Sequence, residues 1–479
     1  METYKIAENK MFHAAGRDFI FLAADNTIFE MDDRIKGILK KSCLAEEFTQ
    51  EDAFAKLSCP PEDKNELFDE LIRSRALVSS KGKDVTRRID FEKMSIRLKT
   101  LVLHVTDACN LGCRYCYYGD AGHAASAKAK MSRKVAFRAV DFLMENSGDL
   151  KEVIIVFFGG EPLLNLDLIR FIVDYARKKA TEKEIRIDFA ITTNGTLLND
   201  KAIGFLRENN IGVTISIDGF EKVHDRFRRF PNGAPSYGAI LPGLKKLLAD
   251  KEGKPVVARV TVAGESKYIP EILDHLLSLG FSEAGFAPVT TSDLSYQLSL
   301  GEMEQLLSHF KMLSETFIDH AKRDEFYGFT NLVDNLVVLH EGERKDYPCG
   351  AGLSLFSVDT KGRLYLCQRL TGEESSCMGD VFSGFDRLAL SRFRQQAFIS
   401  GKKACTECWV RKICAGGCYH EALVREGGLA EPNMHYCQWI KDWVELGLAV
   451  YGRLTVECPG YLEKLSMLRG HEPLMNHSI

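Results

Sequence analysis

Cysteine is the residue type in this 479-residue chain that most plainly carries chemistry, and the chain has 14 cysteines. Cys109, Cys113 and Cys116 stand in a C-x3-C-x2-C loop, and nine more cysteines follow Pro348. Three thiolates this close together can hold three irons of a cubane cluster and leave the fourth iron open to a small molecule. A closed tetrahedral zinc site would need a fourth nearby ligand. The loop therefore predicts an iron–sulfur site at which chemistry takes place.

The composition indicates the class of protein that carries such a site and excludes some partners. Apolar residues make up 45% and charged residues 27%, which is ordinary for a globular protein of several folding units. The net charge of −4 gives no overall positive field, so we expect no nucleic-acid partner. The first residues, METYKIAENKMF, contain no apolar signal core, and no apolar run approaches a membrane span. We expect a cytoplasmic protein without a membrane partner, in which cysteines serve metals or catalysis rather than disulfides.

The first 80 residues have a pattern of their own. Alternating stretches (YKIA, DFIFLA, TIFEM) predict short strands, and helices are predicted at Asp33–Ser42, Thr49–Leu57 and Pro61–Ser74. We therefore expect a β-hairpin and three helices in residues 1–80. The polar residues 81–99 are predicted to form a linker.

From Leu101 onward, apolar strands alternate six times with amphipathic stretches. The strands are predicted at LVLHVT, EVIIVFF, IRIDFAIT, IGVTISI, VVARVTV and FSEAGFAPV. This pattern predicts an α/β fold, a partial (β/α)6 barrel over residues 100–300, with chemistry at the carboxyl ends of its strands. Bridging helices (301–345), a cysteine-rich and strand-poor region (346–445) and a tail (446–479) are expected to follow.

The three-cysteine loop, with Tyr115 before its last cysteine, follows the first predicted strand and resembles the radical S-adenosylmethionine (radical SAM) superfamily. The next three strand ends also resemble segments of that family. These segments are Gly159-Gly160-Glu161-Pro162, Thr192-Thr193-Asn194-Gly195 and Ser216-Ile217-Asp218-Gly219.

The resemblance implies a SAM site at these strand ends. In the family the first segment receives the methionine amine of SAM, and the other two lie beside its ribose and carboxylate. The resemblance also implies reductive cleavage of SAM to a 5′-deoxyadenosyl radical. Arg228, in the basic stretch 224–229, is interpreted either as a ligand of the SAM carboxylate or as a solvated surface charge.

The later cysteines resemble the seven-cysteine SPASM signature that follows radical SAM barrels in peptide-modifying enzymes. By analogy, one auxiliary [4Fe–4S] cluster is held by Cys405, Cys408, Cys414 and Cys437. The other is held by Cys349, Cys367 and Cys418, with either Cys377 or an open iron completing it. With the cluster of the loop, the resemblance implies three [4Fe–4S] clusters and SAM as cofactors. A zinc ribbon over 405–418 is the alternative interpretation.

The N-terminal unit resembles the winged-helix element with which many radical SAM peptide maturases bind a leader segment. It would bind by β-augmentation at an exposed edge around Phe19–Phe29. The resemblance implies a radical SAM–SPASM maturase whose partners are a cysteine-containing precursor peptide or small protein subunit and an electron donor such as flavodoxin or ferredoxin. Chain length and layout also resemble the maturases of quinohemoprotein amine dehydrogenase small subunits.

Thioether formation, between a cysteine sulfur and a carbon of another residue, is the predicted reaction, because an iron with a vacant position suits a thiolate substrate. Carbon–carbon crosslinking and formylglycine formation, as in anaerobic sulfatase maturases, are alternatives on the same platform. A non-enzymatic metal-binding adaptor, with zinc in the C-terminal region, is the alternative of another class.

Overall fold

The computed structural model describes residues 2–42, 47–55, 61–80, 89–118, 129–249, 253–264 and 268–470. Within these residues the largest element is a ten-stranded sheet, in the order β11-β10-β9-β8-β7-β6-β12-β13-β14-β15. Its first six strands are parallel and follow one another in chain order. They are β6 (Thr100–Thr106), β7 (Glu152–Gly159), β8 (Arg186–Thr193), β9 (Gly212–Ser216), β10 (Val256–Val262) and β11 (Glu283–Pro288).

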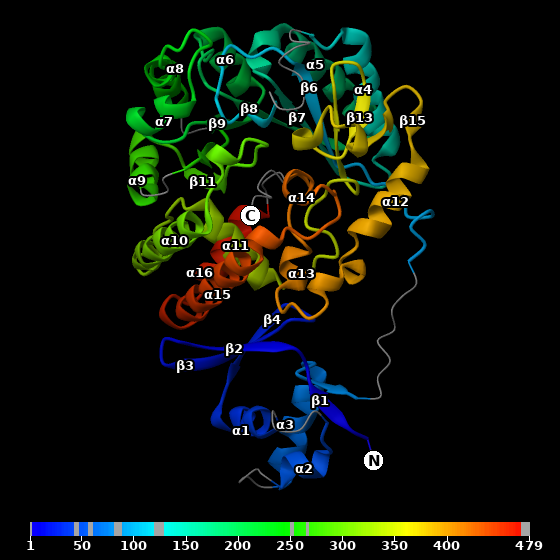
Figure 1. The fold of residues 1–479 in the computed structure, drawn as a ribbon, viewed down its shortest axis with the longest axis vertical. Helices are drawn as coiled ribbons and strands as arrows, with labels where there is room; N and C mark the ends of the chain where they lie inside the picture. The colour runs from blue at the N-terminus through cyan, green and yellow to red at the C-terminus, as the bar shows by residue number, and fades with distance from the viewer. Residues whose placement is uncertain are drawn as a thin grey trace.

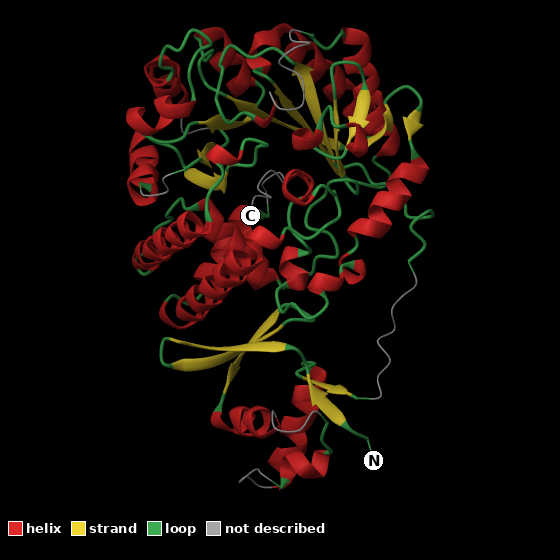
Figure 2. Ribbon diagram, viewed as in Figure 1, coloured by secondary structure: helices red, strands yellow, loops and turns green. Residues whose placement is uncertain are grey.

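Helices alternate with these strands and cover the outer face of the sheet (Figure 2). They are α4 (Arg133–Asn146), α5 (Leu166–Glu182), α6 (Asp200–Glu208), α7 (Glu221–Phe227), α8 (Tyr237–Ala249) and α9 (Ile269–Leu279). All seven residues of β6 are buried, as expected for a strand enclosed on both faces. The predicted partial (β/α)6 barrel is confirmed.

The outer edge of the barrel sheet, at β11, is covered by the bridging helices α10 (Leu300–Ala321) and α11 (Thr330–Glu341). The Asn331 side-chain amide donates to the carbonyl of Phe286 at 2.8 Å and accepts from its backbone N–H at 2.8 Å. One side chain therefore satisfies the backbone groups that an edge strand would otherwise leave open.

The cysteine-rich region is less strand-poor than its sequence predicts. Strands β12 (Leu355–Val358), β13 (Arg363–Tyr365), β14 (Cys377–Asp380) and β15 (Gly384–Phe385) continue the barrel sheet beyond β6. The strand β12 pairs with β6 in parallel, with Leu355 opposite Thr100. Strands of two to four residues are too short to produce a periodic sequence signal, so pairing with the barrel, not local pattern, determines them. Helix α12 (Arg387–Ala397) and the short helices α13 (Arg411–Cys414) and α14 (Tyr419–Glu426) follow.

The N-terminal unit contains a three-stranded antiparallel sheet, with β3 (Arg17–Leu22) between β2 (Asn9–Ala14) and β4 (Thr27–Met31). A second, two-stranded sheet joins β1 (Tyr4–Ile6) to β5 (Leu77–Ser79). Helices α1 (Asp33–Ser42) and α3 (Pro61–Arg73) lie where the sequence predicts them, and α2 (Gln50–Phe54) lies within its predicted range, whose last two residues, 56 and 57, are outside the described residues. The expected exposed edge around Phe19–Phe29 is corrected in part, because β3 is the central strand and only β4 in this range forms an edge.

The three-stranded sheet packs on both faces. Ile20 and Leu22 belong to the core formed with the N-terminal helices, whereas Phe21 belongs to the main core of the molecule. On the second face β2 packs against α15 (Met434–Glu457), where Gly452 allows Phe12 and Phe19 to approach the helix. Figure 1 shows this unit, in blue, below the C-terminal helices and the cysteine-rich region.

The end of the chain is folded further than predicted. The expected boundary between residues 445 and 446 falls inside the 24-residue helix α15, and α16 (Tyr461–Arg469) follows it. Helix α15 packs on α10, α11 and β2, because Trp443, Val444 and Leu448 form a buried stripe. In the described residues no helix is long and apolar enough for a bilayer span.

Candidate active site

The three-cysteine loop lies at the carboxyl end of β6, where the backbone leaves the sheet. Cys109 and Cys116 are exposed and Cys113 is half-buried, and each thiol is close enough for its charge to act on the others. The Leu111 N–H donates to the Cys109 sulfur at 3.4 Å. Burial raises the pKa of the Cys113 thiol to about 12, so a bound metal is needed to form its thiolate at neutral pH.

The glycines that end β7 allow a close approach to this loop. Gly160 N–H donates to the carbonyl of Thr106 at 2.9 Å, and a Cβ on Gly160 would lie 2.3 Å from the Ala108 carbonyl oxygen. Gly159 has a φ of 132°, and a Cβ there would lie 2.2 Å from the Thr106 carbonyl oxygen. Side chains at these two positions would therefore separate the end of β7 from the three-cysteine loop.

Glu161 joins the ends of β7 and β8. Its carboxylate is fully buried and accepts hydrogen bonds from the Thr193 hydroxyl at 2.6 Å, the Asn194 N–H at 2.8 Å and the Leu163 N–H at 3.1 Å. Burial raises the pKa of Glu161 to about 7. Pro162 begins the 3₁₀ turn that follows. A ligand ammonium beside Glu161 would add a favourable charge to these contacts.

Asn194 links the end of β8 to the cysteine loop. Its side-chain amide lies 3.8 Å from the Cys109 sulfur and donates to the Asn110 side-chain oxygen at 2.9 Å. Asn110 in turn donates to the Thr196 hydroxyl at 2.8 Å. This chain of amides orients the first cysteine of the loop.

The end of β9 carries a buried ion pair. Arg228 donates to Asp218 at 2.9 Å, and their side chains are only 9% and 2% exposed. The Tyr115 hydroxyl also donates to the Asp218 carboxylate, whose other oxygen accepts from the Thr261 N–H at 2.9 Å. Ser216, the last residue of β9, is half-buried at the same edge. The interpretation of Arg228 as a solvated surface charge is therefore wrong.

The cavity beside this ion pair has a volume of about 340 Å³ and is lined by Asp218, Thr261 and Phe227 among others. Three free thiols at the carboxyl end of β6, near the buried carboxylate of Glu161 and the Arg228–Asp218 ion pair, fit a [4Fe–4S] cluster with SAM bound at its open iron. In this arrangement Cys109, Cys113 and Cys116 would hold the cluster. The segments at Gly159–Pro162, Thr193–Asn194 and Ser216–Asp218 would surround the SAM molecule.

The auxiliary cysteines lie in two sets, within each of which the thiolate charges act on one another. The charges of Cys367 and Cys418 act on Cys349, and those of Cys405, Cys408 and Cys437 act on Cys414. Burial raises the pKa of both Cys349 and Cys414 to about 12. Among the described residues, no three or more His, Cys, Asp or Glu side chains are placed so that they could hold a single metal ion. We call the sets site I (Cys349, Cys367, Cys418) and site II (Cys405, Cys408, Cys414, Cys437).

Cys377 has different neighbours. It lies in β14 opposite Tyr365, its sulfur is 3.7 Å from the Gly379 carbonyl oxygen, and it contacts the Arg363 side chain. The structure does not bring Cys377 into site I, and its role as a fourth ligand stays a prediction.

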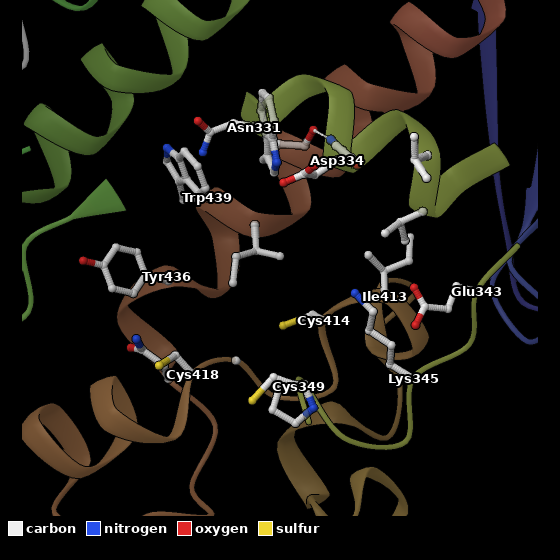
Figure 3. Close-up of a pocket in the computed structure, with 18 of the residues that line it drawn as sticks. Asn331, Asp334, Glu343, Lys345, Cys349, Ile413, Cys414, Cys418, Tyr436 and Trp439 are labelled. Carbon is white, nitrogen blue, oxygen red and sulfur yellow. Dashed lines mark hydrogen bonds between the residues drawn. The ribbon is translucent and has the colours of Figure 1, made fainter. Parts of the chain in front are cut away.

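A cavity of about 300 Å³ opens onto both sites (Figure 3). Cys349, Cys414 and Cys418 line one end, and Trp439 and Asn331 line the other. The Tyr419 hydroxyl, beside the site I thiols, is buried without a hydrogen-bond partner in the described part of the chain. Buried hydroxyls normally form a hydrogen bond. The Tyr419 hydroxyl therefore fits a site at which it would donate a hydrogen bond to a sulfur of the bound cluster.

Polar residues that sequence reasoning missed lie between the SAM site and site I. The charges of Cys116 and Cys367 both act on the Tyr117 hydroxyl, and so do the charges of Arg369 and Arg259. Arg369 lies 3.9 Å from the buried carboxylate of Glu421. Only Arg259 left a sequence signal, as a charge within the apolar strand VVARVTV. These residues come from segments far apart in the chain, so their spacing in the sequence could not predict that they lie close together.

Comparison with known proteins agrees with this geometry. Residues 103–276 match the model of the radical SAM superfamily. An uncharacterised protein of Methanocaldococcus jannaschii is 31% identical over 287 residues, covering 59% of this chain and 89% of that protein. A serine-type anaerobic sulfatase-maturating enzyme of Bacteroides thetaiotaomicron is 28% identical over 71% of this chain and 86% of that enzyme.

Two solved structures share the fold. The structure of anSMEcpe with bound AdoMet covers 78% of this chain and 99% of its own, with a TM-score of 0.66 and 20% identity. Streptococcus suis SuiB bound to the precursor peptide SuiA covers 91% of this chain and all of its own, with a TM-score of 0.50 and 15% identity.

The chain belongs to the radical SAM superfamily. It is a radical SAM enzyme of the SPASM maturase type, and its cofactors are SAM and [4Fe–4S] clusters.

Proposed function

We propose that this enzyme installs thioether crosslinks in a ribosomally made, cysteine-containing peptide or small protein subunit. The observation that carries the proposal is the attachment of the N-terminal unit to the cysteine-rich region. Arg411, three residues after Cys408, forms an ion pair with Glu8, and the Asn26 amide donates to the carbonyls of Glu343 and Lys412. A peptide held by this unit would therefore start close to sites I and II.

The edge of β4 is the place we propose for the leader segment. The two-residue turn at Ala15–Gly16, with φ values of 48° and 76°, makes Ala14 and Arg17 a hydrogen-bonded pair. Because bonded pairs alternate along antiparallel strands, the backbone groups of Ile28 and Glu30 point away from β3. An extended leader would add a strand there.

The reacting residue would lie between Cys116 and Cys367, beside Tyr117. When bound, SAM and its cluster supply a 5′-deoxyadenosyl radical that removes a substrate hydrogen. Site I offers three thiols as ligands of its cluster, so a substrate cysteine can provide the fourth ligand. Burial keeps this region dry, and Arg369 and Glu421 hold its walls together as an ion pair.

Formylglycine formation is the second candidate, because a relative of this chain is a sulfatase-maturating enzyme. The structure of anSMEcpe covers 78% of this chain, whereas SuiB, whose structure contains a precursor peptide, covers 91%. The broader coverage supports a peptide maturase with a leader-binding unit. Carbon–carbon crosslinking would share the same unit and the same cofactors.

The product distinguishes these reactions. The reconstituted enzyme, with SAM and a flavodoxin or chemical reductant, would be incubated with the cysteine-bearing peptide encoded beside its gene. A thioether removes two hydrogens and makes one thiol unreactive towards iodoacetamide. Formylglycine instead creates an aldehyde that reacts with a hydrazide, and a carbon–carbon link leaves every thiol free. Either of these last results would contradict the thioether proposal.

The leader site is tested by Glu30→Pro, which removes an outward N–H from the β4 edge. We expect at least a tenfold loss of kcat/KM on the full-length precursor, because the added strand loses its ladder bond. Glu30→Ala is the matched control, since both variants lose the exposed ion pair with Arg17 at 2.9 Å. Equal kcat/KM for the two variants would reject the β4 edge.

A further inference from the structure

Lys402 is a buried cation between the two auxiliary sites. It is only 5% exposed, and it precedes the short helix η7 (Lys403–Cys405), where the Cys405 N–H donates to the Lys402 carbonyl at 2.9 Å. The charges of Cys405 and Cys414 in site II, and then that of Cys349 in site I, act on its ammonium group. The thiols of site II are thus its strongest sulfur neighbours.

The surrounding backbone is shaped to admit this side chain. Lys402 Nζ lies 3.5 Å from the Ala415 carbonyl oxygen, immediately after the ligand Cys414. Gly416 has a φ of 92°, and a Cβ there would lie 2.4 Å from Nζ. The ring of Tyr419 lies 5.8 Å from Nζ on the side of site I. A side chain larger than hydrogen at 416 would therefore displace the ammonium group.

A buried cation of this kind needs an anionic partner. In the part of the chain that the structure describes, no ion pair joins Lys402 to a carboxylate, and Glu431 is the carboxylate whose charge acts on it. Four thiolates around a cluster would supply the missing negative charge. Reduction adds one further negative charge to such a cluster, so a fixed cation beside it favours the reduced form.

We infer that Lys402 sets the redox potential of the cluster at site II and makes that cluster easier to reduce than a neutral residue at 402 would. The inference rests on the cluster assignment and is independent of which crosslink the enzyme makes. Lys402 acts through the electric field of its ammonium group at the cluster. It changes the redox potential of the cluster without being one of its ligands.

The experiment is an electron paramagnetic resonance titration of the reconstituted full chain. Cys109→Ala, Cys113→Ala and Cys116→Ala remove the signal of the SAM-binding cluster from every sample. In this background we expect Lys402→Met to lower one auxiliary midpoint potential, with about a tenfold smaller reduced fraction at a fixed potential. For a one-electron couple that is a shift of about 59 mV.

Two further variants separate charge from packing. Lys402→Gln keeps a donor for the Ala415 carbonyl and loses the charge, so it is expected to shift the potential as Lys402→Met does. Lys403→Gln removes the same charge from the exposed neighbouring position and is expected to leave both potentials unchanged.

An unchanged potential in Lys402→Met would overturn the inference. So would a wild-type potential in Lys402→Gln, or a loss of iron from either Lys402 variant, since each would assign Lys402 to packing or assembly. Absence of any reducible auxiliary centre in the background protein would instead reject the clusters themselves. The thioether proposal is judged separately, by the product of the peptide reaction.

Discussion

At the scale of single residues, buried charges are what the structure adds to the sequence. The cysteine sets could be predicted because thiolate ligation is a property of the residue and of its spacing. The burial of Arg228 could not be predicted, since a basic stretch has the same pattern on a surface. The ion pair with Asp218, together with the ring of Tyr115 at 5.4 Å, fixes this arginine beside Cys113.

Arg228→Met is expected to destabilise the fold by about 3–5 kcal/mol, because it leaves the carboxylate of Asp218 buried without its partner. The measurement is the free energy of unfolding in urea under anaerobic conditions. Arg186→Met is the control, because Arg186 forms an exposed pair with Glu152 at 3.5 Å and should contribute less than about 1 kcal/mol. Similar losses in the two variants would argue against a buried, structural Arg228–Asp218 pair.

At the scale of elements, α7 supports the end of β9 through a neutral histidine. His224 Nδ1 accepts from the Asp218 N–H at 3.3 Å, and Nε2 lies 3.0 Å from the Ser236 hydroxyl. That hydroxyl donates its hydrogen to the Arg228 carbonyl at 2.7 Å, so it can only accept a hydrogen bond from His224. The neutral imidazole therefore carries its proton on Nε2. Burial lowers the pKa of His224 from 6.5 to about 4.

This shift predicts a loss of stability in acid. Below about pH 6.5 the unfolded chain binds a proton at His224 that the folded chain does not bind until about pH 4. Stability should therefore fall as the pH falls through this window, by up to about 3 kcal/mol. His224→Gln should reduce this slope when unfolding is measured from pH 7 to pH 4. An identical slope in the variant would contradict the assignment.

The elements themselves were predictable where they are long and periodic. The six barrel strands and the N-terminal helices α1 and α3 occur where the pattern places them, because their apolar faces repeat over several turns or residues. The strands β12–β15 escaped prediction because they exist through pairing with the barrel sheet. The central place of β3 escaped it too, since β2 (NKMFHA) lacks strict alternation.

At the scale of the whole molecule, the sheet joins the two chemical regions. Strand β12 pairs with β6, the strand that leads into the three-cysteine loop, so the cysteine-rich region extends the barrel sheet directly. The N-terminal unit is attached on the other side of that region, through Glu8 and Arg411. The N-terminal unit, the three-cysteine loop and the auxiliary sites therefore belong to one continuous body.

We expect Cys109, Cys113 and Cys116 to hold an open cluster at which SAM is cleaved. The most direct test measures 5′-deoxyadenosine released from SAM by the reduced, reconstituted enzyme and by its Cys109→Ala, Cys113→Ala, Cys116→Ala variant. We expect the variant to release none and to keep the iron of sites I and II, about two thirds of the total. Release of 5′-deoxyadenosine by the variant at the wild-type rate would contradict it.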